Sequence, residues 1–423
     1  MGETQEVVRE GDYVIIQKQN YTKIHKVKKS IVKLGNIEVD ISAIVGQPYW
    51  TTYKMEPKAN AKRLYELKKS EQAISISDEI IKDVTSGSDN REIFDDGSSQ
   101  KLSTQEIINL RECGMSAHNI VSHLIENSKT FFNKTEYSQE KYLKKKEQKY
   151  YEYITIRKPT LRLISEVLLR QPTKLLGLRM DTLAQLVTKS EVQSGGFCIV
   201  YESGCSGLVV AAVLDQLGSN GTLIHIHPGN SDRHTEAVQA LNLQESQLNQ
   251  ILSLNIQKLC VSQKSDTISK VLTTNTGDSL TVNNNTSESI HEENILGKRK
   301  AEGTCPVGNK IRRINEDTEK AMLILKERKA DSLIIVGKEH PSNIFKKLIK
   351  YLEISRPFVV YYPLREPLVD MYVELKLRHD IIGLRLTESW LRDYQVLPDR
   401  THPNIRISGS GGYLLSGLYV DST

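Results

Sequence analysis

The hydrophobic and polar positions of the chain follow different patterns before and after about residue 159. In the N-terminal part, short runs of apolar residues are separated by turn residues such as Gly35 and Asn36. This pattern predicts short strands that form a small antiparallel barrel or sheet. The predicted strands are 13–17, 22–28 and 31–39, and the mixed, polar stretch 56–103 is expected to be a linker with some local structure.

Helical periodicity begins after this linker. Ser103 and Glu106 form a capping-box pattern, which predicts that a helix begins at Thr104. Further helices are expected at about 116–127 and 138–153. We therefore expect three parts: an N-terminal β domain with its linker at 1–90, a helical basic connector at 91–158 and a third domain at 159–423.

In the third domain, predicted strands and helices alternate. This order predicts an α/β fold with a doubly wound, Rossmann-like sheet that has an antiparallel end. The predicted strands are 197–201, 222–227, 254–260, 332–337, 357–362, 381–387 and 412–420, with helices near 206–217, 232–241, 342–352 and 366–378. The stretch 262–320 interrupts this order. Because 12 of the 17 residues at 273–289 are Ser, Thr or Asn, we expect 262–320 to be a disordered insertion.

The turn after the strand 197–201 is the first candidate site. Strand, loop and helix have the layout of a nucleotide-binding unit, and a loop that binds S-adenosylmethionine usually reads acid-x-Gly-x-Gly-x-Gly. Glu202 and Gly204 fit this pattern, whereas Ser206 and Leu208 stand at the second and third glycine positions. His227 ends the next strand, where an acidic residue usually holds the ribose. We therefore expect a degenerate pocket and no cofactor in this chain; an ordinary βα unit that never bound a nucleotide is the alternative.

Catalytic and metal-binding residues are not evident in the sequence. The fourth strand ends in Val336, Gly337 and Lys338, where a methyltransferase acting on adenine N1 needs a carboxylate, and Glu339 lies in the following loop. The ten histidines have no metal-ligand spacing, and none of the five cysteines forms a Cys-x-x-Cys pair. No apolar run approaches the length that spans a membrane, so no membrane partner is expected.

Two basic regions are candidates for binding and targeting. Net charge is only +5, so any surface for nucleic acid is expected to be local. Lysines alternate with tyrosines at 129–153, a composition that suits contacts to RNA phosphates and unpaired bases, although a solvated helix face would also have it. The candidate RNA-binding residues are Lys134, Lys141, Lys144, Lys145, Lys146 and Lys149. Two clusters in the insertion, Lys298, Arg299 and Lys300 with Lys310, Arg312 and Arg313, fit a bipartite nuclear import signal, although an untargeted basic patch would also contain them.

Several separate motifs together resemble one family. They are DDGSSQKL at 95–102, EKYLKKK at 140–146, RMDTL at 179–183, LPDRTHP at 397–403 and GGYLLSG at 411–417. The chain resembles the non-catalytic subunits of the eukaryotic tRNA methyltransferases that make 1-methyladenosine at position 58. The resemblance covers the chain from the N-terminal strands to the C-terminus, apart from 262–320.

This resemblance implies a class I methyltransferase fold and a division of labour. A catalytic homologue would carry S-adenosylmethionine, and two pairs of subunits would form a heterotetramer in the nucleus. Residues 397–403 and 412–420 would lie in subunit contacts; a plain edge strand of the core sheet is the alternative for 412–420. The substrates would be tRNAs, including initiator tRNA, which links the subunit to translation initiation. Two other readings stay open at this point: an active S-adenosylmethionine-dependent RNA methyltransferase, and a stand-alone RNA-binding protein related to translation initiation.

Overall fold

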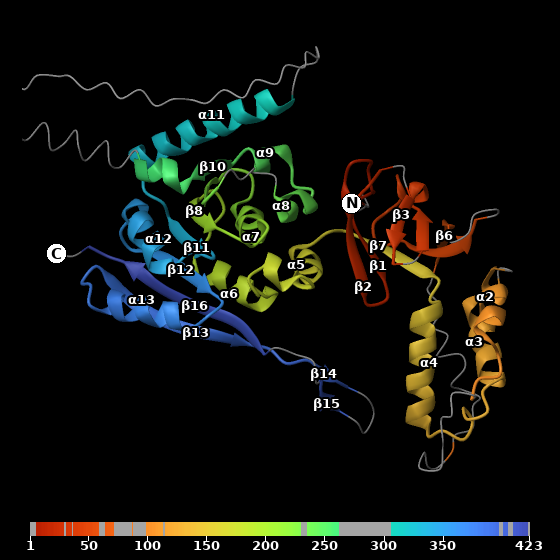
Figure 1. The fold of residues 1–423 in the computed structure, drawn as a ribbon. Coiled ribbons are helices and arrows are strands. Elements are labelled where there is room, and N and C mark those ends of the chain that lie inside the picture. Colours follow the sequence, from red (N-terminus) through yellow and green to blue (C-terminus); the bar gives the residue numbers. More distant parts are fainter. Residues whose placement is uncertain are drawn as a thin grey trace, which may run out of the picture. The chain divides into compact units, whose positions relative to one another are not determined.

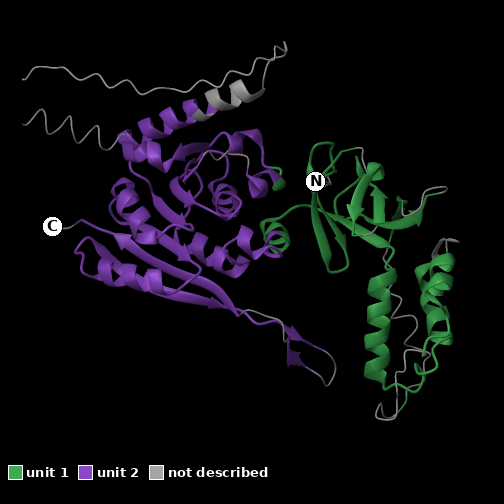
Figure 2. Ribbon diagram, viewed as in Figure 1, with its two compact units in different colours: residues 1–167, 240–242 green, residues 168–239, 243–423 purple. Residues whose placement is uncertain are grey.

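The computed structural model describes most of the 423 residues. The described residues are 6–28, 31–35, 37–58, 64–71, 87, 99–112, 115–229, 235–261, 306–396, 401–404 and 409–421, with the backbone alone for 306–312 and 314. They form two compact units, residues 1–167 with 240–242 and residues 168–239 with 243–423 (Figure 2).

Unit 1 contains a seven-stranded sheet in the order β2-β1-β7-β5-β6-β4-β3. Neighbouring strands are antiparallel except β4 and β6, so the expected antiparallel sheet has one parallel pair. Alternate residues such as Val14, Ile16, Tyr53 and Ile154 point into one apolar core. The strands are β1 Tyr13–Lys18, β2 Tyr21–Lys26, β3 Ile31–Leu34, β4 Ile37–Asp40, β5 Thr52–Pro57, β6 Leu64–Ser70 and β7 Tyr153–Arg157.

Two strands of unit 1 correct the sequence prediction. β6 lies in the stretch that we expected to be a linker. The sequence pattern did not predict it as a strand, because exposed charged residues surround its one buried residue, Leu67. β7 begins where the third predicted helix was expected to end and lies within the expected helical connector, but it pairs with β1 and β5. Residues 153–157 therefore belong to the N-terminal sheet.

The described residues between β6 and β7 include three helices, α2 Thr104–Glu112, α3 Ala117–Glu126 and α4 Glu136–Tyr150. The capping box is confirmed, since the backbone N–H of Ser103 donates to Glu106 Oε2 and the N–H of Glu106 donates to Ser103 Oγ. The α3 and α4 helices pack through a second apolar cluster that includes Ile120, Leu124 and Leu143. Figure 1 shows α4 beside α3.

Unit 2 is the expected doubly wound α/β domain. Its sheet has the order β10-β9-β8-β11-β12-β16-β13, with parallel pairs from β10 to β12 and an antiparallel end at β16 and β13. The strands are β8 Phe197–Glu202, β9 Thr222–His227, β10 Ile251–Asn255, β11 Ser332–Val336, β12 Arg356–Tyr362, β13 Ile381–Trp390 and β16 Ser410–Tyr419. The short pair β14 Tyr394–Gln395 and β15 His402–Pro403 continues the β13–β16 hairpin (Figure 1).

The helices of unit 2 begin with η3 Pro172–Lys174 and α6 Met180–Lys189. The other described helices are α7 Leu208–Leu217, α8 Glu236–Ala240, α9 Glu245–Leu248, α11 Pro306–Glu327, α12 Pro341–Leu348, η4 Ile349–Tyr351 and α13 Glu366–Lys376, and residues 256–261 are also helical. The α5 helix, Leu161–Leu169, leads from one unit into the other. None of the described helices is long and apolar enough to span a membrane.

Two predictions for unit 2 were wrong in position. The third strand is 251–255 rather than 254–260, because the chain turns into a helix at 256. The expected disordered insertion ends earlier than 320, since α11 covers 306–327 and its Ala321 and Leu325 enter the core of the sheet. Residues 262–305 lie outside the described part.

Candidate functional site

The loop between β8 and α7 lies where doubly wound sheets bind their ligands, outside the carboxyl ends of the strands. All six residues of β8 are buried, and Gly204 and Gly207 take positive φ angles of 85° and 78°. The predicted loop scaffold is therefore present. The loop differs from a nucleotide-binding loop in that side chains of this chain occupy the space around its glycines.

Glu202 caps a helix of its own chain. Its Oε1 accepts a hydrogen bond from the backbone N–H of Gly207 at 2.5 Å, and its Oε2 accepts one from Val210 at 3.0 Å. The first N–H groups of a helix need acceptors outside the helix, and Gly207 at the N-cap has no side chain to supply one. Burial raises the pKa of Glu202 from 4.5 to about 7, while the hydrogen bonds from α7 lower it. Both carboxylate oxygens are thus engaged within the loop.

Other side chains fill the space next to the glycines. A Cβ atom on Gly204 would lie 2.6 Å from Lys338 Cε and 3.4 Å from Leu176 Cδ2. A Cβ atom on Gly207 would lie 1.6 Å from Thr235 Oγ1. In a nucleotide-binding loop, glycines let the ligand approach the backbone closely. Here the glycines admit Lys338 and Thr235 instead.

The turn after η3 is fastened to the same loop. Ser206 Oγ donates to the carbonyl oxygen of Lys174 at 3.2 Å, and Cys205 Sγ donates to that of Leu175 at 3.4 Å. Ser206 itself has a φ of 55°, so it adopts the left-handed backbone that glycine would take there. Leu208 is fully buried as the first residue of α7.

His227, at the end of β9, is bound to the neighbouring strand. Its Nε2 and Ser253 Oγ on β10 are 2.9 Å apart, and burial lowers the pKa of His227, which keeps the ring neutral. A neutral ring cannot give the charged hydrogen bonds to ribose hydroxyls that a carboxylate gives. The adjacent His225 is also buried, and its pKa falls to about 3. No group of three or more potential metal ligands occurs among the described residues.

The end of β11 has no carboxylate on the strand itself. Val336 is buried, and Gly337 packs against the Tyr201 ring. Glu339, in the loop beyond, accepts a hydrogen bond from Ser203 Oγ at 3.2 Å. Ser203 therefore holds Glu339 across this edge, and the loop with Lys338 and Thr235 packed on its glycines does not fit an adenosyl group.

The six candidate RNA-binding lysines lie on α4 or just before it. Lys141, Lys144, Lys145 and Lys149 are exposed, while Leu143 and Tyr150 face the core. Lys144 pairs with Glu140.

Lys134 and Lys146 are half-buried and lie beside one aromatic ring, apart from the four exposed lysines. Their Nζ atoms lie 5.6 and 5.1 Å from the centre of the Tyr142 ring. Burial, followed by the charge of Lys149, lowers the pKa of Lys146. The exposed face is therefore made by four of the six lysines.

The proposed import signal is only partly within the described residues. Lys298, Arg299 and Lys300 lie outside them. Lys310, Arg312 and Arg313 are on the first turns of α11, and Arg313 is exposed.

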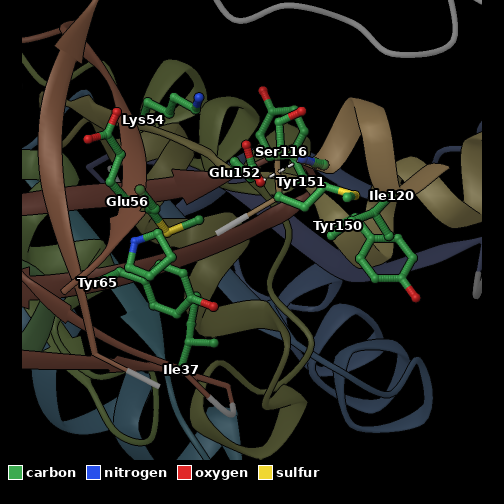
Figure 3. Close-up of a pocket in the computed structure, with 13 residues that line it drawn as sticks. Ile37, Lys54, Glu56, Tyr65, Ser116, Ile120, Tyr150, Tyr151 and Glu152 are labelled. Carbon is green, nitrogen blue, oxygen red and sulfur yellow. Dashed lines mark hydrogen bonds between the residues drawn. The ribbon is translucent and has the colours of Figure 1, made fainter. Parts of the chain in front are cut away.

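Unit 1 also has a pocket of about 270 Å³ between its sheet and the helices (Figure 3). Lys54, Glu56 and Tyr65 line it from β5 and β6, and Ser116 and Glu152 line it from the helical side. Glu152 is already engaged, since its Oε1 accepts a hydrogen bond from the N–H of Ala117 at 2.7 Å. The pocket is smaller than most ligand sites.

Comparison with known proteins gives the family. The model of the Gcd10p family matches residues 7–287. The chain belongs to the Gcd10p family. It is 33% identical, over 98% of its length and 89% of the relative's, to the tRNA (adenine(58)-N(1))-methyltransferase non-catalytic subunit TRM6 of Mus musculus. It is 28% identical, over 99% of its length and 80% of the relative's, to the subunit of that name in Dictyostelium discoideum.

Solved structures similar to this Gcd10p-family chain include an S-adenosylmethionine-dependent O-methyltransferase from Thermotoga maritima, with a TM-score of 0.49, 11% identity and coverage of 99% and 97% of the two chains. Another is the tRNA (m1A58) methyltransferase of Aquifex aeolicus, with a TM-score of 0.44, 10% identity and coverage of 98% and 100%.

Sequence reasoning missed how this Gcd10p-family chain fills its loop. Lys338 and Thr235 reach it from distant parts of the chain, and no local pattern signals such contacts. The role of Glu202 did have a signal, because a helix that begins after glycine needs an acceptor from elsewhere.

The buried Glu202 predicts a pH-dependent stability. Its pKa is higher in the folded chain than in the unfolded one, so the stability it contributes is present at low pH and is lost as pH rises from about 4.5 to about 7. In Glu202→Gln this loss is absent. We expect the unfolding free energy of the variant to gain about 3 kcal/mol relative to the parent chain between pH 5 and pH 8, measured by urea denaturation. A difference that does not change with pH would contradict this.

The occupied loop predicts that this Gcd10p-family chain does not bind S-adenosylmethionine. Titration of the purified chain in a calorimeter should give no saturable heat at micromolar concentrations. Lys338→Ala should not restore binding, because Thr235, Glu202 and His227 remain in place. Saturable micromolar binding by the parent chain would contradict the prediction.

Proposed function

We propose that this chain is the non-catalytic, tRNA-binding subunit of a tRNA 1-methyladenosine-58 methyltransferase and supports a catalytic homologous subunit. The observation that carries the proposal is the loop after β8, where Glu202 accepts hydrogen bonds from the chain's own backbone and Lys338 and Thr235 pack against the glycines. The names of relatives that align with nearly the whole chain support the same function.

The proposed division of labour follows from the chemistry. S-adenosylmethionine bound to the catalytic partner supplies the methyl group. The target base must be brought out of its stacked position before its N1 can be reached, which costs a few kcal/mol. Lysines that neutralise phosphates offset this cost by releasing counterions. The exposed face of α4 is the surface that this chain contributes.

The proposal extends to assembly and location. Two pairs of subunits would form a heterotetramer, acting in the nucleus on tRNAs that include initiator tRNA and so linked to translation initiation. The basic clusters at 298–300 and 310–313 support nuclear import. Native mass analysis of the purified complex tests the stoichiometry directly.

Reconstitution tests the central proposal. Each subunit is purified alone and together, and transfer of a labelled methyl group to tRNA is measured. We expect transfer only by the pair, and no transfer by this chain alone. Methylation by this chain without a partner would reject the proposal, as would full activity of the partner without this chain.

The exposed lysines of α4 give a first quantitative prediction. Changing Lys141, Lys144, Lys145 and Lys149 to Ala in the reconstituted complex should weaken tRNA binding at least about tenfold. The slope of log affinity against log salt should fall by about 3, since four phosphate contacts are lost. The same four changes to Arg keep the charge and serve as the control, with near-parental binding. An unchanged affinity and salt slope in the Ala variant would reject this surface.

The arm beyond the β13–β16 hairpin predicts a subunit contact. Tyr394 and Val396 are 54% and 75% exposed, and apolar side chains exposed together mark interaction sites. β16 lies between β12 and β13, so the expected contact through 412–420 is better tested in this arm than by deleting an internal strand. Val396→Asp should abolish co-purification of the partner, and Ile31→Asp, an exposed position in unit 1, should not. Normal association of Val396→Asp would contradict the prediction.

A further inference from the structure

Trp50 in unit 1 has a backbone conformation that is rare for a bulky residue. Its φ angle is 71°, in the left-handed region that glycine adopts without strain. The conformation is fixed by the neighbouring strand, since the N–H of Trp50 donates to the Ile156 carbonyl at 2.6 Å and the N–H of Ile156 donates to the Thr51 carbonyl at 3.0 Å. Strained residues held in this way often occur at functional sites.

Burial does not compensate for this strain, because Trp50 remains 55% exposed. The side chain is instead displayed with a cation beside it. The Arg157 guanidinium carbon lies 4.4 Å from the centre of the indole, and its Nη1 donates to Gln17 Oε1 at 2.7 Å. This hydrogen bond holds the guanidinium against the ring. An indole stacked on an arginine offers an aromatic surface and a positive charge at one point.

The outer face of the sheet continues this chemistry away from Trp50. Arg157, Thr155 and Tyr153 alternate along β7 and point away from the core that Ile154 and Ile156 enter. Thr155 pairs with Thr52 on β5, and their hydroxyl oxygens are 3.1 Å apart.

One row further along, Tyr153 pairs with Lys54, which also lines the pocket beside the helices, and Lys54 pairs with Lys68 of β6. The Tyr153 ring also packs edge-on to Tyr151, with ring centres 5.8 Å apart. Aromatic rings, hydroxyls and cations thus alternate over three rows of one sheet face.

We propose that this outer face, defined by Trp50, Thr52, Lys54, Tyr153, Thr155 and Arg157, binds an unpaired segment of RNA with one base stacked on Trp50. Sheet faces that bind single-stranded RNA combine exposed aromatic rings for the bases with cations for the phosphates. A protein partner would instead favour a buried apolar core with few charges. The inference rests on the proposed function only in taking tRNA as the source of the RNA.

The chain offers a direct probe of this face. It contains two tryptophans, Trp50 and Trp390, so Trp390→Phe labelled with 5-fluorotryptophan gives a single ¹⁹F resonance from Trp50. Titration with a short unstructured RNA oligonucleotide should shift this resonance saturably, and unlabelled tRNA should reverse the shift by competition. The same labelled chain in complex with its unlabelled partner should respond in the same way.

Trp50→Gly supplies the matched functional test. Glycine takes the φ of this position without strain, so the thermal stability of the variant should equal or exceed that of the parent. Loss of the stacked base should lower oligonucleotide affinity about tenfold. Trp50→Phe keeps an aromatic ring and should retain most of the affinity.

Three outcomes would overturn the inference. The first is a ¹⁹F resonance that RNA does not shift, and the second is an unchanged oligonucleotide affinity in Trp50→Gly. The third is a resonance that shifts when the partner is added and then no longer responds to RNA, which would identify the face as a protein contact. Partner-dependent methylation measured on the same samples separates failure of this face from failure of the proposed function. If the oligonucleotide shifts the resonance but methylation does not depend on a partner, the RNA-binding face is supported and the proposed function is rejected.

Discussion

The hydrogen bonds from the start of α7 to the buried carboxylate of Glu202 are the interaction on which the loop of unit 2 depends. The helix begins after Gly207, which has no side chain to accept its first N–H groups. A buried carboxyl group is costly unless it is hydrogen-bonded, and these donors meet that need. Glu202, the loop glycines and α7 therefore satisfy one another's hydrogen bonds without a ligand. The loop contributes to the stability of the fold in this way.

This self-sufficiency affects the space around the loop. Once the loop supplies its own partners, side chains such as Lys338 and Thr235 pack where a ligand would otherwise touch the backbone. The sheet then serves as a rigid frame for surfaces elsewhere. The exposed lysines of α4 belong to the other unit, so the Rossmann-like sheet and the proposed RNA-binding surface are built by different parts of the chain.

The sequence predicted those elements whose signals are local. The capping box at Ser103 located α2, and the runs of buried apolar residues located the central strands of unit 2. β6 was missed because its outward residues are charged and only Leu67 is buried. In the site, Ser206 and His227 could be recognised in the sequence as departures from the cofactor-binding pattern. The contacts that fill the loop could not be predicted, because they join residues far apart in sequence. Trp50 gave no signal at all, because its backbone angle depends on pairing with β7.

The position of β7 has a consequence for how unit 1 tolerates change. β6 and β7 flank the same strand, β5, on its two sides. The helices α2 to α4 therefore leave and re-enter the sheet at points only about two strand spacings, or about 10 Å, apart. They are arranged like a domain inserted into a loop, whose ends the host already holds together. The segment with α2 to α4 can therefore change in length or be replaced while the strands of the sheet keep their register. The reason is that the entropy cost of closing a loop grows slowly with the length of the loop.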